Sequence, residues 1–295
     1  MTHRLLLDVS SLAYRAYFAL RDGPFTPEGA HVGAVHGYLD MVTRLIATRR
    51  PDEVVHVYDH DWRPMERTKI YPAYKGNRPP EPEGLPEQFL MIRRVLDATE
   101  MVQAQTEGWE AEDAIGAFCL DAREDDRLEI VSGDRDLIQL VRDPVVTLLF
   151  TVRGVTDLTT FDEAGVFAKY GVTAAQYGDF AILRGDPSDG LPGVRGVGQK
   201  TAQALVSAFG SLDAVLEAAE AGDRTIKPAV RARLLEARGY LDDMRRLVPV
   251  NADAPLSLWA GERDEAELVR LGAELSIKGP LQRLVAALEA AAHHT

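Results

Sequence analysis

Nine acidic residues occur where carboxylates could bind divalent metal ions. Three of them, Asp8, Asp59 and Asp134, end the runs RLLLD, VVHVYD and LEIVSGD. Short apolar runs of this kind are typical of buried parallel strands. Ligands of an open α/β sheet bind outside the carboxyl ends of its strands, so we expect these three charges to meet at one edge. No obvious partner in the sequence neutralises them, whereas Mg²⁺ and Mn²⁺ favour carboxylate oxygens.

The other six acidic residues lie in three further motifs. They are Glu110, Glu112 and Asp113 in EGWEAEDAIGAF, Asp136 in SGDRDLIQL, and Asp186 and Asp189 in RGDPSDGLPG. Each motif alone also has an ordinary explanation, because acids are favoured at helix starts and in turns. Metal binding therefore depends on the motifs meeting in space.

The composition indicates a soluble globular protein. The 295 residues are 46% hydrophobic and 27% charged, and no apolar stretch approaches the roughly 18 to 20 residues of a membrane span. The single cysteine, Cys119, fits a reducing cytoplasm. A net charge of −13 argues against a generally basic nucleic-acid surface, but residues 62–78 contain five basic side chains against one acid.

A long segment rich in proline, basic and aromatic residues, WRPMERTKIYPAYKGNRPPEPEGLP, covers 62–86. It contains Tyr71, Tyr74, Lys75 and Arg78. Loops of this length are more often functional than shorter ones. The segment is either a plain exposed patch or a gate for single-stranded nucleic acid, in which rings stack on bases and cations contact phosphates.

The motif GVRGVGQKTA has two interpretations. A phosphate-binding loop starting at Gly193 would need a lysine where Gln199 stands, and it should follow a buried strand rather than a turn. The favoured alternative is a hairpin between helices, whose glycines Gly196 and Gly198 and whose Lys200 bind a DNA backbone phosphate.

The elements that must position these residues alternate along the first half of the chain. Strand-like runs lie at about 4–8, 53–59, 128–134 and 145–152, and helical periodicity is clear at 33–50, 85–98 and 110–122. This alternation predicts an α/β fold with a mostly parallel central sheet. From about residue 162 onward we expect no further strands, only short helices separated by glycine turns.

Six motifs in this order resemble the bacterial 5′-nuclease family, which includes flap endonucleases and the 5′–3′ exonuclease domain of DNA polymerase I. They are LLLDVSSLAYRAYFAL, VYD, ERTKIYPAYKGNRPP, EGWEAEDA, SGDRDLIQL and RGDPSDGLPGVRGVGQKTA, and they span residues 5 to 202. The self-contained chain looks more like a stand-alone member than a polymerase fragment.

The resemblance implies a PIN-like 5′-nuclease fold. Residues 1–160 would form the nuclease core with a helical arch at 62–95, and 161–295 a helical DNA-binding region with a helix-three-turn-helix at about 178–235. The implied function is metal-dependent, structure-specific 5′-flap endonuclease or 5′–3′ exonuclease activity on DNA in replication or repair. Alternatives from other classes are a non-catalytic DNA-structure-binding paralogue, an RNA-directed PIN-like nuclease and, more distantly, a phosphate-loop nucleotidase.

The family's functional residues map onto this sequence as follows. All nine acidic residues above would bind two or more Mg²⁺ or Mn²⁺ ions, and the hairpin 193–200 would hold K⁺. Phosphate contacts would come from Arg67 and Lys75, with Arg15 and Arg78 as further candidates. The partners would be DNA with 5′ flaps, nicks or free 5′ ends, and RNA primer–DNA hybrids, bound by a monomer associated with the bacterial nucleoid.

Two positions depart from the family pattern. Glu112 stands where aspartate is usual, which puts metal geometry and preference in question. Gly190 stands where asparagine is usual, which would loosen its turn. Neither change removes a carboxylate, so we expect an active enzyme.

Overall fold

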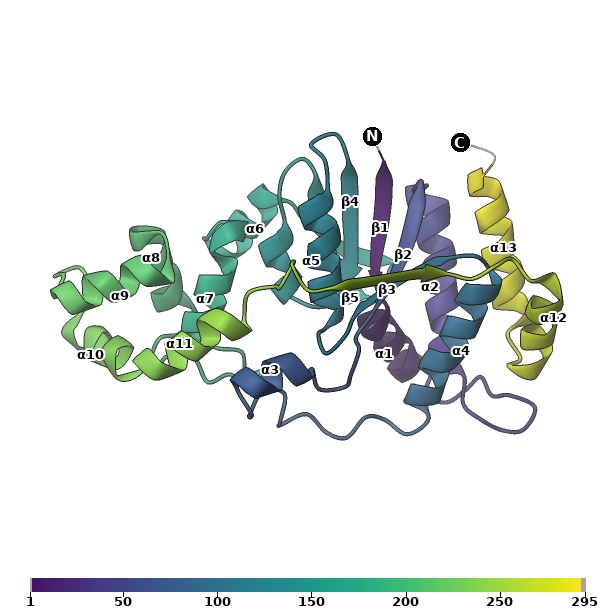
Figure 1. The fold of residues 1–295 in the computed structure, drawn as a ribbon, viewed down its shortest axis with the longest axis horizontal. Helices are drawn as coiled ribbons and strands as arrows, with labels where there is room; N and C mark the ends of the chain where they lie inside the picture. Colours follow the sequence, from purple (N-terminus) through teal and green to yellow (C-terminus); the bar gives the residue numbers. More distant parts are fainter. Residues whose placement is uncertain (1, 293–295) are drawn as a thin grey trace.

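The computed structural model describes residues 2–292 and contains one seven-stranded sheet (Figure 1). Its strand order is β6-β5-β4-β1-β2-β3-β7. The strands are β1 His3–Asp8, β2 Glu53–Tyr58, β3 Val102–Thr106, β4 Arg127–Ser132, β5 Val146–Arg153, β6 Asp157–Phe161 and β7 Leu256–Ala260. The five inner strands are parallel, and the two edge strands pair antiparallel. The predicted α/β fold with a mostly parallel sheet is therefore confirmed.

Helices cover both faces of the sheet because successive strand side chains point to opposite sides. Leu5 and Leu7 of β1 face one apolar core, and Leu6 faces the other. The first core is shared with α1 Val9–Ala19, α2 Gly33–Arg49, α4 Leu85–Ala98, α12 Glu265–Glu274 and α13 Lys278–Ala292. The second core contains the buried face of α5 Ala111–Asp121.

A group of short helices extends away from the sheet (Figure 1). They are α6 Glu163–Tyr170, α7 Tyr177–Arg184, α8 Gln199–Phe209, α9 Leu212–Ala221, α10 Pro228–Glu236 and α11 Arg238–Leu247. Their apolar side chains belong to the same core as α5, so this helical region is continuous with the sheet domain. None of the helices within residues 2–292 has both the length and the apolar character that a bilayer span requires.

The expectation that strands end at about residue 162 is wrong. β7 pairs antiparallel with β3, with Ala260 opposite Val102, and the two helices after it pack against α2 and α4. Residues 256–292 therefore return to the sheet, although the sequence placed them with the helical region.

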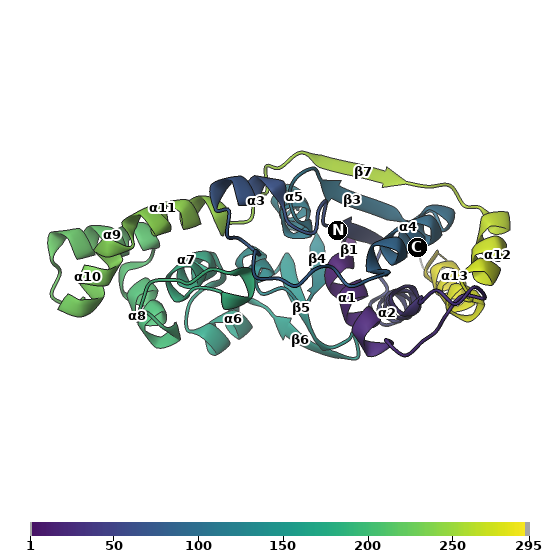
Figure 2. The same cartoon turned by 90° about the horizontal axis from the view of Figure 1, so that it is seen from below.

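The segment predicted to be an arch, 62–95, contains one short helix, α3 Met65–Ile70, then an irregular stretch, and then most of α4. Seen from below, this stretch runs from α3 past α1 to α4 (Figure 2). We call residues 71–84 the crossing loop. It is fastened to the turn at 186–189 by hydrogen bonds from the Lys75 amide to the Asp189 carbonyl (2.8 Å) and from the Asn77 side chain to the Pro187 carbonyl (2.8 Å).

Candidate active site

A cavity of about 1410 Å³ lies at the carboxyl edge of the parallel strands. Eight of the nine predicted acidic residues line it: Asp8, Asp59, Glu110, Glu112, Asp134, Asp136, Asp186 and Asp189. Asp8 ends β1, Asp59 follows β2 directly, and Asp134 lies two residues beyond β4. The sheet topology therefore brings together carboxylates that are up to 181 positions apart in the chain (from 8 to 189).

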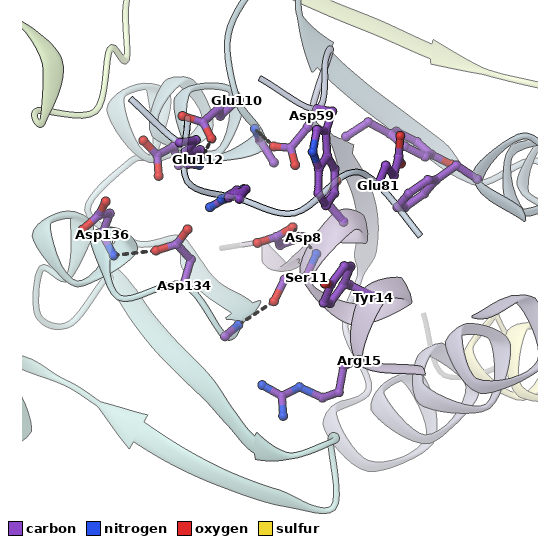
Figure 3. A pocket seen from close by; sticks show the side chains of 18 of the residues that line it. Asp8, Ser11, Tyr14, Arg15, Asp59, Glu81, Glu110, Glu112, Asp134 and Asp136 are labelled. Atoms are coloured by element: carbon purple, nitrogen blue, oxygen red, sulfur yellow. Dashed lines mark hydrogen bonds and ion pairs between the residues drawn. The ribbon is translucent and has the colours of Figure 1, made fainter. Parts of the chain in front are cut away.

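Three of these carboxylates are close enough to share one cation. Glu112, Asp134 and Asp136 each offer an oxygen atom, and these atoms all lie within 4.8 Å of one another (Figure 3). Glu112 thus reaches the group despite its extra methylene relative to aspartate. The Asp134 side chain also accepts a hydrogen bond from the Asp136 amide (2.9 Å), which fixes its orientation.

The electrostatics of the cavity favour a bound cation. Burial and the neighbouring charge of Asp59 raise the pKa of Asp8 to about 7, against hydrogen bonds from Ser132 and Ser11 that lower it. Burial raises the pKa of Glu112, and burial together with Asp134 raises that of Asp136. These carboxylates resist ionisation together, and a divalent ion would supply the missing positive charge.

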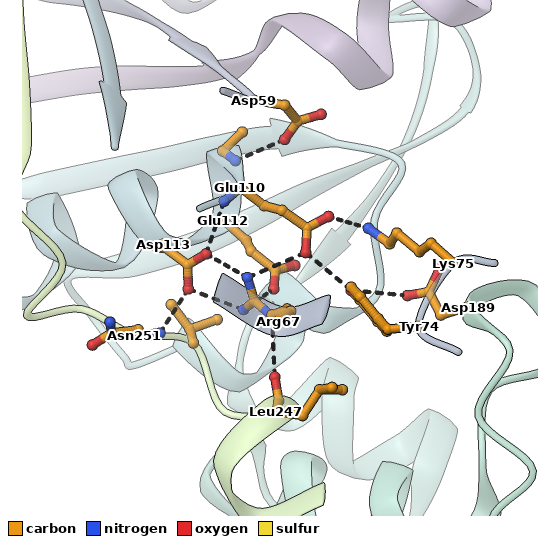
Figure 4. Close-up of polar contacts among 12 residues, drawn as sticks. Asp59, Arg67, Tyr74, Lys75, Glu110, Glu112, Asp113, Asp189, Leu247 and Asn251 are labelled. Atoms are coloured by element: carbon orange, nitrogen blue, oxygen red, sulfur yellow. Dashed lines mark hydrogen bonds and ion pairs between the residues drawn. The ribbon is translucent and has the colours of Figure 1, made fainter. Parts of the chain in front are cut away.

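Glu110, unlike the three strand-end aspartates, has two cationic partners in the protein. Its carboxylate is bonded to the Lys75 ammonium and lies 3.1 Å from the Arg67 guanidinium (Figure 4). Burial would raise the pKa of Glu110, but Lys75 and Arg67 outweigh it, and the pKa is lowered. The crossing loop and α3 therefore bring cations onto α5.

Arg67, which was predicted to contact a substrate phosphate, is buried inside the protein. The side chain is 1% exposed and does not line the cavity. Its Nη1 and Nη2 atoms donate to Asp113 and Glu112 at 2.5 Å each, and its Nε atom donates to the Leu247 carbonyl at 3.1 Å. Arg67 is an internal counter-ion of the acids on α5.

The predicted metal ligand Asp113 belongs to the same internal network. It is 0% exposed and does not line the cavity. Its oxygens accept hydrogen bonds from Arg67, from the Glu110 amide (3.0 Å) and from the Asn251 amide (2.8 Å). Asp113 therefore caps the start of α5, which was the ordinary explanation of this motif.

The two tyrosines that were predicted to stack on bases contact other residues of the protein. Tyr74 is 2% exposed, and its hydroxyl donates to Glu110 at 3.0 Å and lies 3.4 Å from Asp189. Tyr71 is half-buried and packs edge-on against Tyr240, with ring centroids 6.2 Å apart. The Tyr74 ring lies inside the protein in this structure, and contact of the two tyrosines with bases stays a prediction.

The remaining predicted cations do line the cavity. Lys75 has a left-handed backbone (φ 52°), a conformation that non-glycine residues adopt only under constraint. Arg78 donates to Asp189 at 2.9 Å. Arg15 lies at the opposite wall, where it donates to the carbonyls of Thr151 and Val152 at 3.0 Å each.

The hairpin residues differ in accessibility. The Gly193 amide donates to the Tyr240 hydroxyl (3.0 Å), so it is not available for the predicted phosphate contact. Gly196, Gly198 and Lys200 are exposed, and Gly198 is the cap residue of α8. Gly190, the departure from the family pattern, has φ 75°, a left-handed conformation that glycine adopts readily.

Sequence reasoning missed one wall of the cavity. Pro86, Phe89, Leu90 and Arg93 of α4 line it, together with Trp62. The sequence contained a sign of this wall, because residues spaced at 86, 89, 90 and 93 lie on one face of a helix.

Two family models together match residues 3–267. Residues 3–171 match the family described as "5'-3' exonuclease, N-terminal resolvase-like domain", and residues 172–267 match "5'-3' exonuclease, C-terminal SAM fold". The chain is 43% identical over 303 residues to a "5'-3' exonuclease" of Streptomyces coelicolor, covering 97% of this chain and all of that one. It is 37% identical to a DNA polymerase I of Mycobacterium bovis, covering 97% of this chain but 32% of the polymerase.

Solved structures share the fold at low sequence identity. A zinc-bound T5 5′-exonuclease superposes with a TM-score of 0.67 at 18% identity, covering 97% of this chain and 98% of that one. The catalytic core of Rad2 in complex with DNA substrate gives 0.60 at 14% identity, covering 98% and 91%. From these matches and the sequence relatives, the chain belongs to the 5′-3′ exonuclease family.

Proposed function

We propose that this protein is a divalent-metal-dependent 5′ nuclease that hydrolyses DNA phosphodiesters at 5′ flaps, nicks and free 5′ ends. The observation that carries the proposal is the acidic cavity at the ends of the parallel strands. Its carboxylates resist joint ionisation, which is the property expected of a site completed by metal ions. The S. coelicolor relative named a 5′-3′ exonuclease supports the same activity.

The donor set fits Mg²⁺ or Mn²⁺, since every candidate ligand is a carboxylate oxygen. The residues that would hold the ions are Asp8, Asp59, Glu110, Glu112, Asp134 and Asp136, with Asp186 and Asp189 further out. When bound, the ions would activate water as the nucleophile and stabilise the charge on the leaving oxygen. K⁺ at the hairpin 193–200 stays a prediction.

The protein's own side chains would orient these groups and add positive charge. Asp8 accepts hydrogen bonds from the Ser11 amide (2.9 Å) and the Ser132 hydroxyl (2.6 Å), so its oxygens have fixed directions. Asp59 accepts from the Ala111 amide at the start of α5 (2.8 Å). Such support holds ligands in position before substrate arrives.

Lys75 is the cation best placed to act on a phosphate. Burial would lower its pKa, but the charges of Glu110 and Asp189 outweigh burial and raise it, so the ammonium stays charged at neutral pH. A charged group held at the cavity wall would stabilise negative charge developing on the phosphate. Arg78 and Arg15 lie at the same cavity and would contact neighbouring phosphates.

The exposed hairpin at 193–200 would bind the double-stranded part of the substrate. Gly198 and Lys200 at the start of α8 offer backbone amides and a positive charge to a phosphate, a contact that carries no sequence information. RNA primer–DNA hybrids would therefore bind as DNA duplexes do, and a role in replication or repair follows from such substrates.

The test is cleavage of a 5′-flap oligonucleotide labelled at its 5′ end, in Mn²⁺ or Mg²⁺ and then in EDTA. Asp134→Asn should abolish cleavage, whereas Asp253→Asn, an exposed residue outside the cavity, should leave it unchanged. Flap binding without metal-dependent cleavage by the wild-type protein would instead support a non-catalytic DNA-structure binder. Preferential cleavage of single-stranded RNA would support the PIN-like alternative.

A further inference from the structure

One buried hydroxyl lies between the two strand ends that carry Asp8 and Asp134. It belongs to Ser132, the last residue of β4, whose side chain is 0% exposed and does not line the cavity. β1 and β4 are parallel neighbours with Leu7 opposite Val131, so Asp8 and Ser132 end the two strands side by side. A buried hydroxyl is stable only when it is hydrogen-bonded, and the partners of this one are two candidate metal-binding residues.

The Ser132 hydroxyl both donates and accepts a hydrogen bond. It donates to the Asp8 carboxylate at 2.6 Å and accepts from the Asp134 backbone amide at 2.9 Å. A hydroxyl carries one proton, so donation to Asp8 leaves its lone pairs for the amide. A hydrogen bond from a hydroxyl to a carboxylate is among the stronger ones in proteins. The direction of the Asp8 carboxylate and the position of the Asp134 backbone therefore depend on the same oxygen atom.

Further hydrogen bonds extend this connection on both sides. The Gly133 amide donates to the Ser11 hydroxyl of α1 at 2.9 Å, which fastens the end of β4 to α1 at a second point. The Asp134 carboxylate accepts from the Asp136 amide at 2.9 Å (Figure 3). Hydrogen bonds that follow one another in this way strengthen each other inside a protein. Ser132 is thus the link between the end of β1 and the carboxylate pair that follows β4.

We propose that Ser132 is a positioning residue for metal binding, whose hydroxyl holds Asp8 and Asp134 in one fixed arrangement. This inference rests on the proposed metal-dependent function, because both aspartates are candidate ligands in the cavity. Ser132 itself would not contact an ion, since its hydroxyl is shared between Asp8 and the Asp134 amide and lies outside the cavity. Residues that orient metal ligands without contacting the metal matter greatly for affinity.

The test compares Ser132→Ala, which removes the hydroxyl, with Ser132→Thr, which keeps it. Thr99→Val is the matched control, because it also removes a buried hydroxyl that has two hydrogen-bond partners. Thr99 is 5% exposed, donates to the carbonyls of Val95 (2.9 Å) and Leu96 (3.1 Å), and does not line the cavity. Three quantities are measured on protein stripped of metal: Mn²⁺ affinity by calorimetry, the thermal melt in EDTA, and hydrogen exchange of the Asp134 amide by NMR.

Ser132→Ala should weaken Mn²⁺ binding by about 10- to 100-fold, the range typical for loss of a group that orients a metal ligand. The Asp134 amide should exchange faster in this variant, even without metal, because it has lost its acceptor. Ser132→Thr should keep both the Mn²⁺ affinity and the exchange rate close to wild type. Thr99→Val should lower the thermal melt but leave the Mn²⁺ affinity unchanged.

Unchanged Mn²⁺ affinity in Ser132→Ala would overturn the inference, and a lower melt alone would make Ser132 a purely structural residue. Weaker affinity with unchanged exchange of the Asp134 amide would also overturn it, since the hydroxyl would then act through Asp8 alone. An equal loss of affinity in Thr99→Val would do the same. If Ser132→Ala does not fold, Ser132→Cys replaces it, because a thiol is only a weak donor. Failure of the nuclease proposal would look different: the wild-type protein would bind Mn²⁺ and cleave no DNA.

Discussion

Asp8 should reduce the stability of the metal-free protein at neutral and higher pH. Burial and the charge of Asp59 raise its pKa from 3.8 to about 7 in the folded protein. Between these two pH values the folded state binds more protons at Asp8 than the unfolded state does, so stability falls as pH rises. The loss of stability caused by ionisation of Asp8 is complete above about pH 7 and absent below about pH 4.

The expected magnitude follows from the size of this shift. A rise from 3.8 to about 7 corresponds to roughly 4 kcal/mol of unfolding free energy once Asp8 is fully ionised. Asp8→Asn removes the charge but keeps an oxygen to accept the Ser11 amide that caps α1. The metal-free variant should therefore be more stable than wild type at pH 8, by up to about 4 kcal/mol, and equal to it near pH 4.

The assay is urea unfolding followed by circular dichroism in EDTA at pH 4, 6 and 8. Asp253→Asn, which removes an equal charge from an exposed turn, is the control and should show no pH-dependent gain. Added Mn²⁺ should stabilise the wild-type protein at pH 8 more than it stabilises Asp8→Asn. The reasoning is refuted if Asp8→Asn is less stable than wild type at pH 8, or if its advantage does not shrink as pH falls.

Three further predictions follow. Arg67→Met should lower the free energy of unfolding by roughly 3–5 kcal/mol, because it leaves the buried carboxylates of Glu112 and Asp113 without their cation. Urea unfolding measures this change in free energy. If the variant loses cleavage while its stability is unchanged, Arg67 contacts the substrate instead of serving as an internal counter-ion. Mn²⁺ affinity measured by calorimetry should rise as pH increases from 6 to 8 and then level off, because protons compete at Asp8, whose pKa is about 7. A flat profile would exclude Asp8 as a ligand. Lys200→Ala should weaken binding of blunt duplex and reduce its salt slope by about 0.9, whereas an unchanged slope would remove the hairpin from the DNA contact.

The strands that carry the acids were predictable because each is a short, mostly apolar run buried on both faces. β3, β6 and β7 were missed because their sequences, VQAQT, DLTTF and LSLWA, lack such a run. Gln103 is fully buried in β3, where its side chain bonds to the Tyr58 hydroxyl (2.9 Å) and to Asp97 (2.6 Å). A polar residue that is satisfied inside the core cannot be told from an exposed one by its letter alone.

The candidate site was predictable to the extent that it depends on strand ends. Parallel strands bring their carboxyl ends to one edge whatever the rest of the chain does, so Asp8, Asp59 and Asp134 could be placed together. The roles of Arg67 and Asp113 could not be predicted, because they depend on Leu247 and Asn251, which approach α5 from the far end of the chain. From the sequence alone, acidic and basic residues that pair with each other inside the protein cannot be distinguished from residues that face a ligand.

The guanidinium of Arg67 joins three parts of the molecule that are distant in sequence: α3, the acids of α5, and the carbonyl of Leu247 at the end of α11. A guanidinium is a planar group with fixed donor directions. If the helical region tilts when it seats on a duplex, this bond either breaks or transmits the tilt to Glu112. Arg67 thus ties the end of α11 to the Glu112 carboxylate through a single rigid group.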